Sequence, residues 1–106
     1  MPRAHEEVRV RRRTRTRMRR PPMYRVIMLN DDYTPMDFVV GILMAIFQHP
    51  RPRAEALMWK VHTEGAAVVG VYPRDIAESK IMRTHQASRA AGHPLRCIME
   101  RDDADR

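Results

Sequence analysis

The strongest constraint on this chain is a polar stretch, residues 30–37, that separates two apolar segments of different periodicity. The segment before it, Met23 to Leu29, alternates its side chains as a strand does. The segment after it, Pro35 to Gln48, repeats apolar residues at helical spacing. An asparagine and two aspartates, Asn30 to Asp32, therefore lie on a tight connection at the N-terminus of a helix.

The same stretch carries residue types that begin helices. Thr34 suits the N-cap, Pro35 suits the first helical position, and Asp37 stands three residues after Thr34, close to a capping box. Capping alone does not need the whole polar set, so the surplus predicts a rim that binds a cation. From this stretch alone, the commoner explanation is a turn that is rich in Asn and Asp because these residues favour turns.

Four further elements follow along the chain. Periodicity and Pro or Gly boundaries predict a helix from Arg53 to Thr63, a strand from Ala66 to Tyr72, a helix from Pro73 to Ala91 and a strand from Leu95 to Glu100. The order is β-α-α-β-α-β.

Each element presents a face that suits a common core. The apolar positions are Val26 and Met28 in the first strand, Ala54, Leu57, Met58 and Val61 in the second helix, and Cys97 and Met99 in the last strand. The third helix has a small-residue face with Ala77, Ile81, Thr84 and Ser88, which leaves Arg74, Glu78 and Lys80 exposed.

Charge divides the chain into a basic arm and a neutral body. Residues 1–20 contain nine Arg and two Glu, whereas residues 21–106 contain eleven Lys plus Arg and eleven Asp plus Glu. We expect a disordered Arg-rich arm at 1–20, one domain at 21–101 and a charged, frayed C-terminus at 102–106. The chain lacks an apolar run long enough to span a membrane and an N-terminal secretory signal, so a cytoplasmic protein is the expectation.

Catalytic and metal-binding patterns are absent from the sequence. The single cysteine, Cys97, rules out an intrachain disulfide and lies in an apolar alternation that predicts a buried thiol. The five histidines do not stand at metal-ligand spacing, so we expect neither metal nor cofactor. Asp32 and His62 could form an acid/base pair in a hydrolase or isomerase, but a nucleophile is lacking. The commoner explanation of His62 by itself is a structural histidine at the edge of the core, hydrogen-bonded to backbone.

Three segments resemble the ClpS adaptor domain, over roughly residues 21–100. They are Pro22 to Val39, with Asn30-Asp31-Asp32-Tyr33-Thr34-Pro35 inside it; Leu57-Met58-Trp59-Lys60-Val61-His62, with a following Gly and Gly70-Val71-Tyr72; and His93-Pro94-Leu95-Arg96-Cys97. Proteins of this family recognise the N-terminal residue of degradation substrates and hand them to the ClpA-ClpP protease. The resemblance implies an α/β (α+β) fold with a three-stranded antiparallel sheet packed against three helices.

The resemblance also implies a site. The residues that match the family's α-amino group ligands are Asn30, Asp31, Asp32 and His62. Those that match its pocket for a Leu, Phe, Tyr or Trp side chain are Thr34, Met36, Val39, Met58, Val61 and Leu95. Met36 matches a gate that disfavours β-branched first residues, and Asp75 and Lys80 match the surface that meets the N-terminal domain of a ClpA-type ATPase. Two features depart from the family: the arm is strongly Arg-rich, and Trp59 stands where an aliphatic residue is common.

The chemistry of these residues agrees with the implied ligand. An α-ammonium group has three N–H donors, which an amide oxygen, a neutral imidazole and carboxylates can accept. We therefore expect a non-catalytic, monomeric adaptor for N-degron peptides that binds no cofactor and no membrane. The alternative is a nucleic-acid-associated protein that binds through its Arg-rich arm, but the neutral body argues against nucleic acid.

Overall fold

The computed structural model describes residues 20–103 and has the predicted order of elements. The elements are β1 Met23–Leu29, α2 Met36–Ala45, α3 Arg51–Glu64, β2 Ala66–Pro73, α4 Arg74–Ala90 and β3 Arg96–Arg101. Every predicted boundary lies within three residues of the observed one. The fold class is confirmed, because one three-stranded antiparallel sheet packs against three helices.

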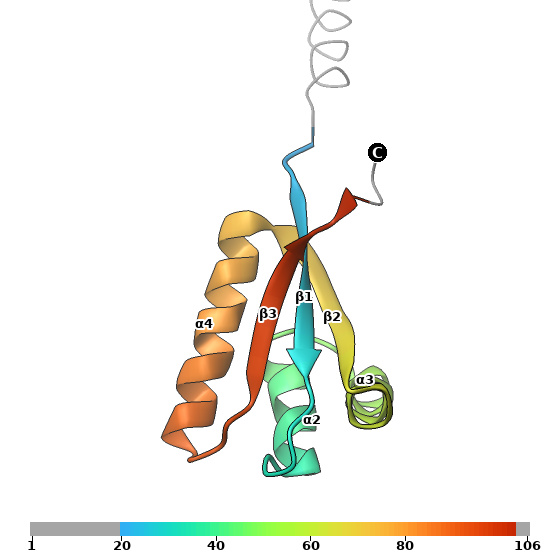
Figure 1. Ribbon diagram of the computed structural model, residues 1–106, viewed down its shortest axis with the longest axis vertical. Helices are drawn as coiled ribbons and strands as arrows, with labels where there is room; N and C mark the ends of the chain where they lie inside the picture. Colours follow the sequence, from blue (N-terminus) through green and yellow to red (C-terminus); the bar gives the residue numbers. More distant parts are fainter. Residues whose placement is uncertain (1–19, 104–106) are drawn as a thin grey trace, which may run out of the picture.

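The sheet has the order β2-β1-β3, so the first strand is central (Figure 1). At the lower end of the sheet in this view, Leu29 pairs with Ala66 on one side and with Arg96 on the other. The register with β2 shifts between Val26 and Ile27. Near this irregularity, His49 donates from Nε2 to the carbonyl oxygen of Val69 at 2.6 Å.

The helices cover one face of the sheet and enclose the core with it (Figure 1). Val26 and Met28 are fully buried in this core, whereas Ile27 and Leu29 on the other face of β1 are only partly buried. The predicted faces of α3, α4 and β3 are confirmed as well. The buried thiol of Cys97 lies in the same core, and burial raises its pKa to about 12.

The predicted start of α2 is wrong in detail. The N-cap position is Pro35, whose ψ of 145° is extended, and the first helical residue is Met36. A capping box does not form, because the hydroxyl of Thr34 donates to the carboxylate of Asp31 instead. At the other end, Gln48 has a φ of 60°, which is incompatible with the helix that we predicted up to this residue.

Lys80 also differs from the prediction, because it is half-buried rather than exposed. Its Nζ atom donates to the carbonyl oxygen of Ile46 at 2.7 Å and lies 5.1 Å from the ring centroid of Tyr72. Burial, with the nearby Arg83, lowers the pKa of Lys80. Lys80 therefore joins α4 to the C-terminal end of α2, where a cation is favourable.

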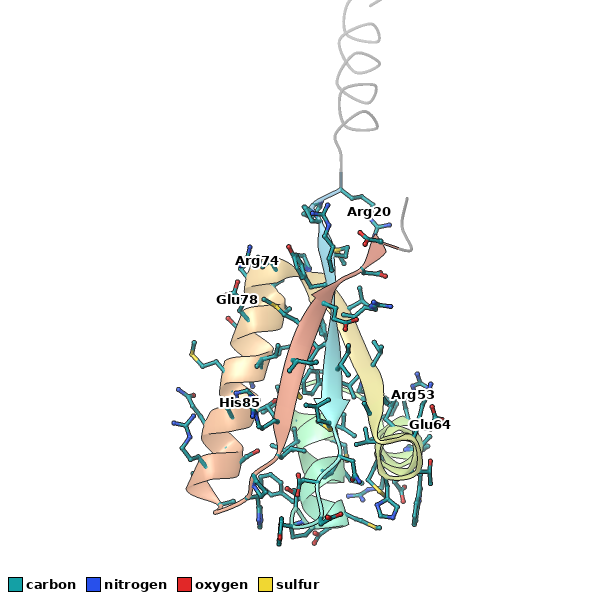
Figure 2. All side chains as sticks on the ribbon, in the orientation of Figure 1. Arg20, Arg53, Glu64, Arg74, Glu78 and His85 are labelled. Atoms are coloured by element: carbon teal, nitrogen blue, oxygen red, sulfur yellow. The ribbon has the colours of Figure 1, made fainter. Side chains whose placement is uncertain are left out.

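The rest of the polar face of α4 is solvent-exposed, as predicted. Arg74 and Glu78 form an exposed ion pair of 3.1 Å on one side of the helix (Figure 2). His85 lies further along α4 and accepts a hydrogen bond at Nε2 from the backbone N–H of Cys97 in β3.

The predicted terminal segments are only partly described. Residues 1–19 and 104–106 lie outside the described residues, and with them most of the Arg-rich arm. Asp102, where the frayed end was expected to begin, donates its backbone N–H to the carbonyl oxygen of Met23 at 2.8 Å.

Candidate functional site

The register of the sheet brings the acidic connection and the helix of His62 to one end of the molecule. Leu29 pairs with Ala66, and the next residue, Asn30, donates its backbone N–H to the carbonyl oxygen of Gly65 at 2.9 Å. Gly65 is the C-cap of α3, and its φ of 88° suits a glycine. His62 lies in the last turn of α3, so residues that are far apart in sequence converge at this end.

Asp31 organises the connection that follows Asn30. Its Oδ1 atom accepts the backbone N–H groups of Tyr33 and Thr34 at 2.8 and 2.7 Å, and its Oδ2 atom accepts the Thr34 hydroxyl at 2.8 Å. This is the local pattern by which Asp favours turns. The turn and the amine-binding interpretations are therefore compatible, because Asp31 shapes the loop while its charge stays at the site.

The hydrogen bonds also keep Asp31 ionised. Burial alone would raise the pKa of this carboxyl, but the bonds from Thr34 and Tyr33, with the nearby His93, lower it below its ordinary value. Asn30 and Asp32 have exposed side chains. The loop thus presents an amide and two carboxylates at the N-terminal end of α2.

His62 is exposed, and its ring makes no hydrogen bond within residues 20–103. Its ring centroid lies 5.8 Å from that of Trp59, with an angle of 77° between the planes. A structural histidine bonded to backbone, the alternative that the sequence left open, is thus not what the structure contains. The ring nitrogens of His62 remain available to a ligand.

The residues of the predicted apolar pocket belong to α2, to α3 and to the connections that precede α2 and β3. Four of its residues are buried in the core, namely Val39, Met58, Val61 and Leu95. Thr34 is half-buried, and Met36 is 41% exposed. We call these four buried residues the apolar floor of the predicted pocket, and Thr34 and Met36, near the start of α2, are its more exposed members.

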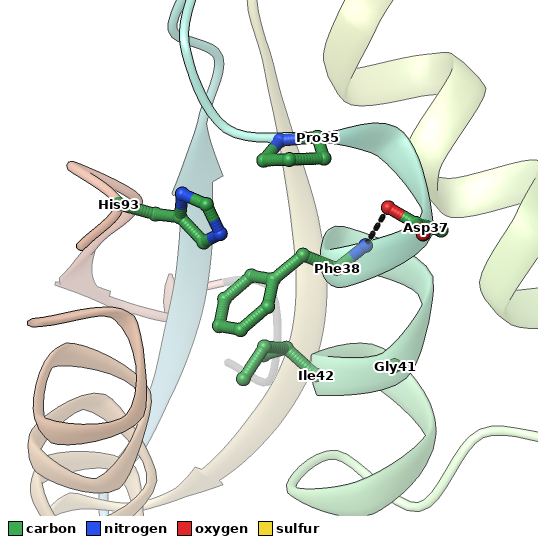
Figure 3. Close-up of a pocket in the computed structure, with 6 residues that line it drawn as sticks. All are labelled: Pro35, Asp37, Phe38, Gly41, Ile42 and His93. Carbon is green, nitrogen blue, oxygen red and sulfur yellow. Dashed lines mark hydrogen bonds between the residues drawn. The ribbon is translucent and has the colours of Figure 1, made fainter. Parts of the chain in front are cut away.

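A separate cavity of about 450 Å³ lies beside α2 and shares no residue with the predicted pocket. Pro35, Asp37, Phe38, Gly41, Ile42 and His93 line it (Figure 3). The rings of Phe38 and His93 meet edge to face, with centroids 4.7 Å apart. Sequence analysis singled out the His93-Pro94 segment only by resemblance and did not predict this cavity.

Two features of the described residues concern metal-binding side chains and helices that could cross a membrane. Within residues 20–103, His, Cys, Asp and Glu side chains do not gather in groups of three that could hold a metal ion. In the same range, the structure lacks a helix that is long and apolar enough to cross a membrane.

Comparison with known proteins decides the family. The sequence profile of a family described as ATP-dependent Clp protease adaptor protein ClpS matches residues 19–98. The chain belongs to the ClpS family. Members of this family are adaptors of a protease and not proteases themselves.

Two relatives support the same conclusion. An ATP-dependent Clp protease adapter protein ClpS from Nitrosomonas eutropha is 47% identical over 88 residues, which cover 83% of this chain and 85% of the relative. The solved structure of Agrobacterium tumefaciens ClpS2 bound to L-phenylalaninamide is 41% identical, with a TM-score of 0.76. This match covers 78% of our chain and 100% of the other.

Two residues beside the predicted site make contacts that the sequence did not predict. Gly65 links α3 to Asn30 through its carbonyl, and its signal in the sequence was only that of a helix end. Trp59 contacts His62 and is 52% exposed. Its signal was its place three residues before His62, which puts both on one side of a helix.

Proposed function

We propose that this ClpS-family protein recognises N-degrons that begin with Leu, Phe, Tyr or Trp and delivers them to a ClpA-ClpP-type protease. The observation that carries the proposal is the hydrogen bond from Asn30 to Gly65. Through it, a loop with two carboxylates is joined to the helix turn of an exposed histidine. In this proposal the apolar floor receives the first side chain of the substrate.

The α-amino group is bound by acceptors from both sides. The side chain of Asn30 supplies an amide oxygen, neutral His62 supplies a ring nitrogen, and Asp31 and Asp32 supply negative charge. A helix N-terminus repels cations, so the carboxylates must outweigh the dipole of α2. Two carboxylates at this position meet that need.

The first side chain of the substrate binds the apolar floor. Burial of a large apolar side chain contributes about 1.5–3 kcal/mol, which is roughly 10- to 150-fold in affinity. In this proposal Met36, which is 41% exposed, excludes β-branched side chains. Neither the amine nor the side chain suffices alone, so a good ligand needs both.

The surface for the ATPase is the first two turns of α4. Asp75 is exposed in the first turn, and Ile76 beside it is 44% exposed. Lys80 is less available to a partner than its place in the sequence suggested, because its Nζ atom donates a hydrogen bond to the carbonyl oxygen of Ile46. We place the protein in the cytoplasm, as a monomer, with this surface facing the N-terminal domain of a ClpA-type ATPase.

The experiment that tests recognition is fluorescence anisotropy with a labelled peptide that begins with Phe. The same peptide with an acetylated N-terminus and one that begins with Val should bind at least tenfold more weakly. Binding of the free Phe-initiated peptide should persist at high salt, because burial of the Phe side chain contributes part of the binding free energy. Binding that ignores the N-terminus would contradict the proposal and lead us to test nucleic acid and the Arg-rich arm.

Delivery needs a second assay. Degradation of a Phe-initiated reporter by purified ClpA and ClpP should accelerate on addition of the native protein. Asp75→Arg should remove the acceleration and leave peptide affinity unchanged. A Glu55→Arg variant, which reverses an exposed carboxylate on α3, is the matched control and should deliver normally.

A further inference from the structure

Trp59 is a large aromatic side chain that folding leaves half exposed beside the proposed amine site. It is the single tryptophan of the chain, and 52% of it is accessible to solvent. Its ring meets the ring of His62 edge to face, with centroids 5.8 Å apart. Trp59 lies within α3, and the hydroxyl of Thr63 donates to its carbonyl oxygen at 2.8 Å. Much of the indole is therefore free to contact a ligand.

The geometry of a peptide places its second residue near this ring. If the α-amino group lies against His62, the next Cα atom is only one Cα–Cα step of about 3.8 Å away from the first. The first side chain is directed to the apolar floor. The second side chain must then lie outside this floor, within reach of a ring that already contacts His62.

We propose that Trp59 forms a subsite for the second residue of the substrate and favours an aromatic side chain there. This inference rests on the proposed N-degron recognition and adds a second position of specificity to it. Offset or edge-to-face contact between the two rings supplies the preference. An aliphatic or small second residue leaves the indole exposed and adds less to the binding free energy.

The test is a double-mutant cycle between the peptide and the protein. Two peptides begin with Phe and differ only at the second residue, Tyr or Ala, so the charge of the acidic loop does not enter the comparison. The native protein should bind the Tyr peptide roughly two- to tenfold more tightly. Trp59→Leu should abolish this ratio, and Trp59→Phe should retain most of it. Because the cycle compares ratios, a uniform loss of affinity in a variant cancels.

Two controls separate the possible outcomes. Met82→Leu changes another exposed apolar side chain, 59% accessible on α4, and should keep the native ratio. The fluorescence of Trp59, excited where tyrosine does not absorb, should shift when the Tyr peptide binds. A ratio that persists in Trp59→Leu, or is absent from the native protein although the Ala peptide binds, overturns this inference alone. Failure of both peptides to bind overturns the adaptor proposal.

Discussion

Replacement of Gly65 by Ala should destabilise the fold and loosen the recognition loop together. Gly65 has a φ of 88°, and a Cβ atom built on it would meet nothing within 4 Å. The cost is therefore conformational rather than steric. A left-handed backbone costs a residue with a Cβ atom about 1–2 kcal/mol. For a domain of this size we expect the melting temperature to fall by about 4–16 °C.

The same change should weaken peptide binding, because the carbonyl oxygen of Gly65 holds the backbone N–H of Asn30 at 2.9 Å. Thermal unfolding followed by circular dichroism gives the first effect, and anisotropy with a Phe-initiated peptide gives the second. Both measurements use conditions in which the variant is fully folded.

Gly41→Ala is the matched control, because Gly41 lies inside α2 and also has free space around its Cβ position. Helix propensity predicts stabilisation by about 1 kcal/mol there. The same substitution should thus act in opposite directions at the two glycines. If both variants melted at the native temperature, or if Gly65→Ala were the more stable one, the conformational reasoning would be wrong.

Three further predictions concern the groups around this site and core. Lys80→Met should lower the free energy of unfolding, measured in urea, by about 1 kcal/mol because it removes the charged donor to Ile46. Lys60→Met, on the exposed face of α3, should change it hardly at all. Equal effects of the two substitutions would contradict the assigned contact. The hydrogen bonds of Asp31 lower its pKa, so its ionised form stabilises the fold above the ordinary value of 3.8. This stabilisation is lost as the pH falls from there through the folded-state pKa. The free energy of unfolding should therefore depend less on pH in this range in Asp31→Asn than in the native protein. Burial raises the pKa of Cys97 to about 12, so iodoacetamide should label the native thiol at pH 8 far more slowly than the thiol of the urea-unfolded chain. Mass spectrometry measures the two labelling rates. Comparable rates would show that the thiol is accessible in the folded protein.

Local pattern was enough to predict the elements and their buried faces. The alternation in β1 assigned Val26 and Met28 to the core, and the spacing in α3 assigned Leu57 and Val61 to it. Both follow from the repeat of side-chain direction in strands and helices. The fold class followed from the order of elements together with the family resemblance.

The exact ends of α2 could not be predicted, because the sequence does not show which of several competing local conformations forms. Thr34 could cap the helix or bond Asp31, and the loop conformation decides for Asp31. At the other end, Gln48 adopts a left-handed backbone although it is not glycine. Such residues are uncommon there, so pattern analysis continues the helix through them.

The site required the register of the sheet, which residue spacing does not reveal. Asn30 and the last turn of α3, which holds His62, lie at the same end of the sheet because Leu29 pairs with Ala66 and Asn30 bonds Gly65. The cavity beside Phe38 and the contact between Lys80 and Ile46 likewise join distant segments. Residue chemistry singled out the stretch from Asn30 to Asp32 and His62, and the resemblance gave them one common role. Neither could distinguish the loop-forming carboxylate of Asp31 from the exposed one of Asp32.

The most direct test of the account is a calorimetric double-mutant cycle between the α-amino group of the substrate and His62. A Phe-initiated peptide, free or N-acetylated, is titrated into the native protein and into His62→Ala. We predict that acetylation weakens binding to the native protein at least tenfold, and that this effect becomes several-fold smaller in His62→Ala, because the two groups contact each other. The same loss on acetylation in both proteins would mean that His62 does not bind the amine, and would contradict the central claim.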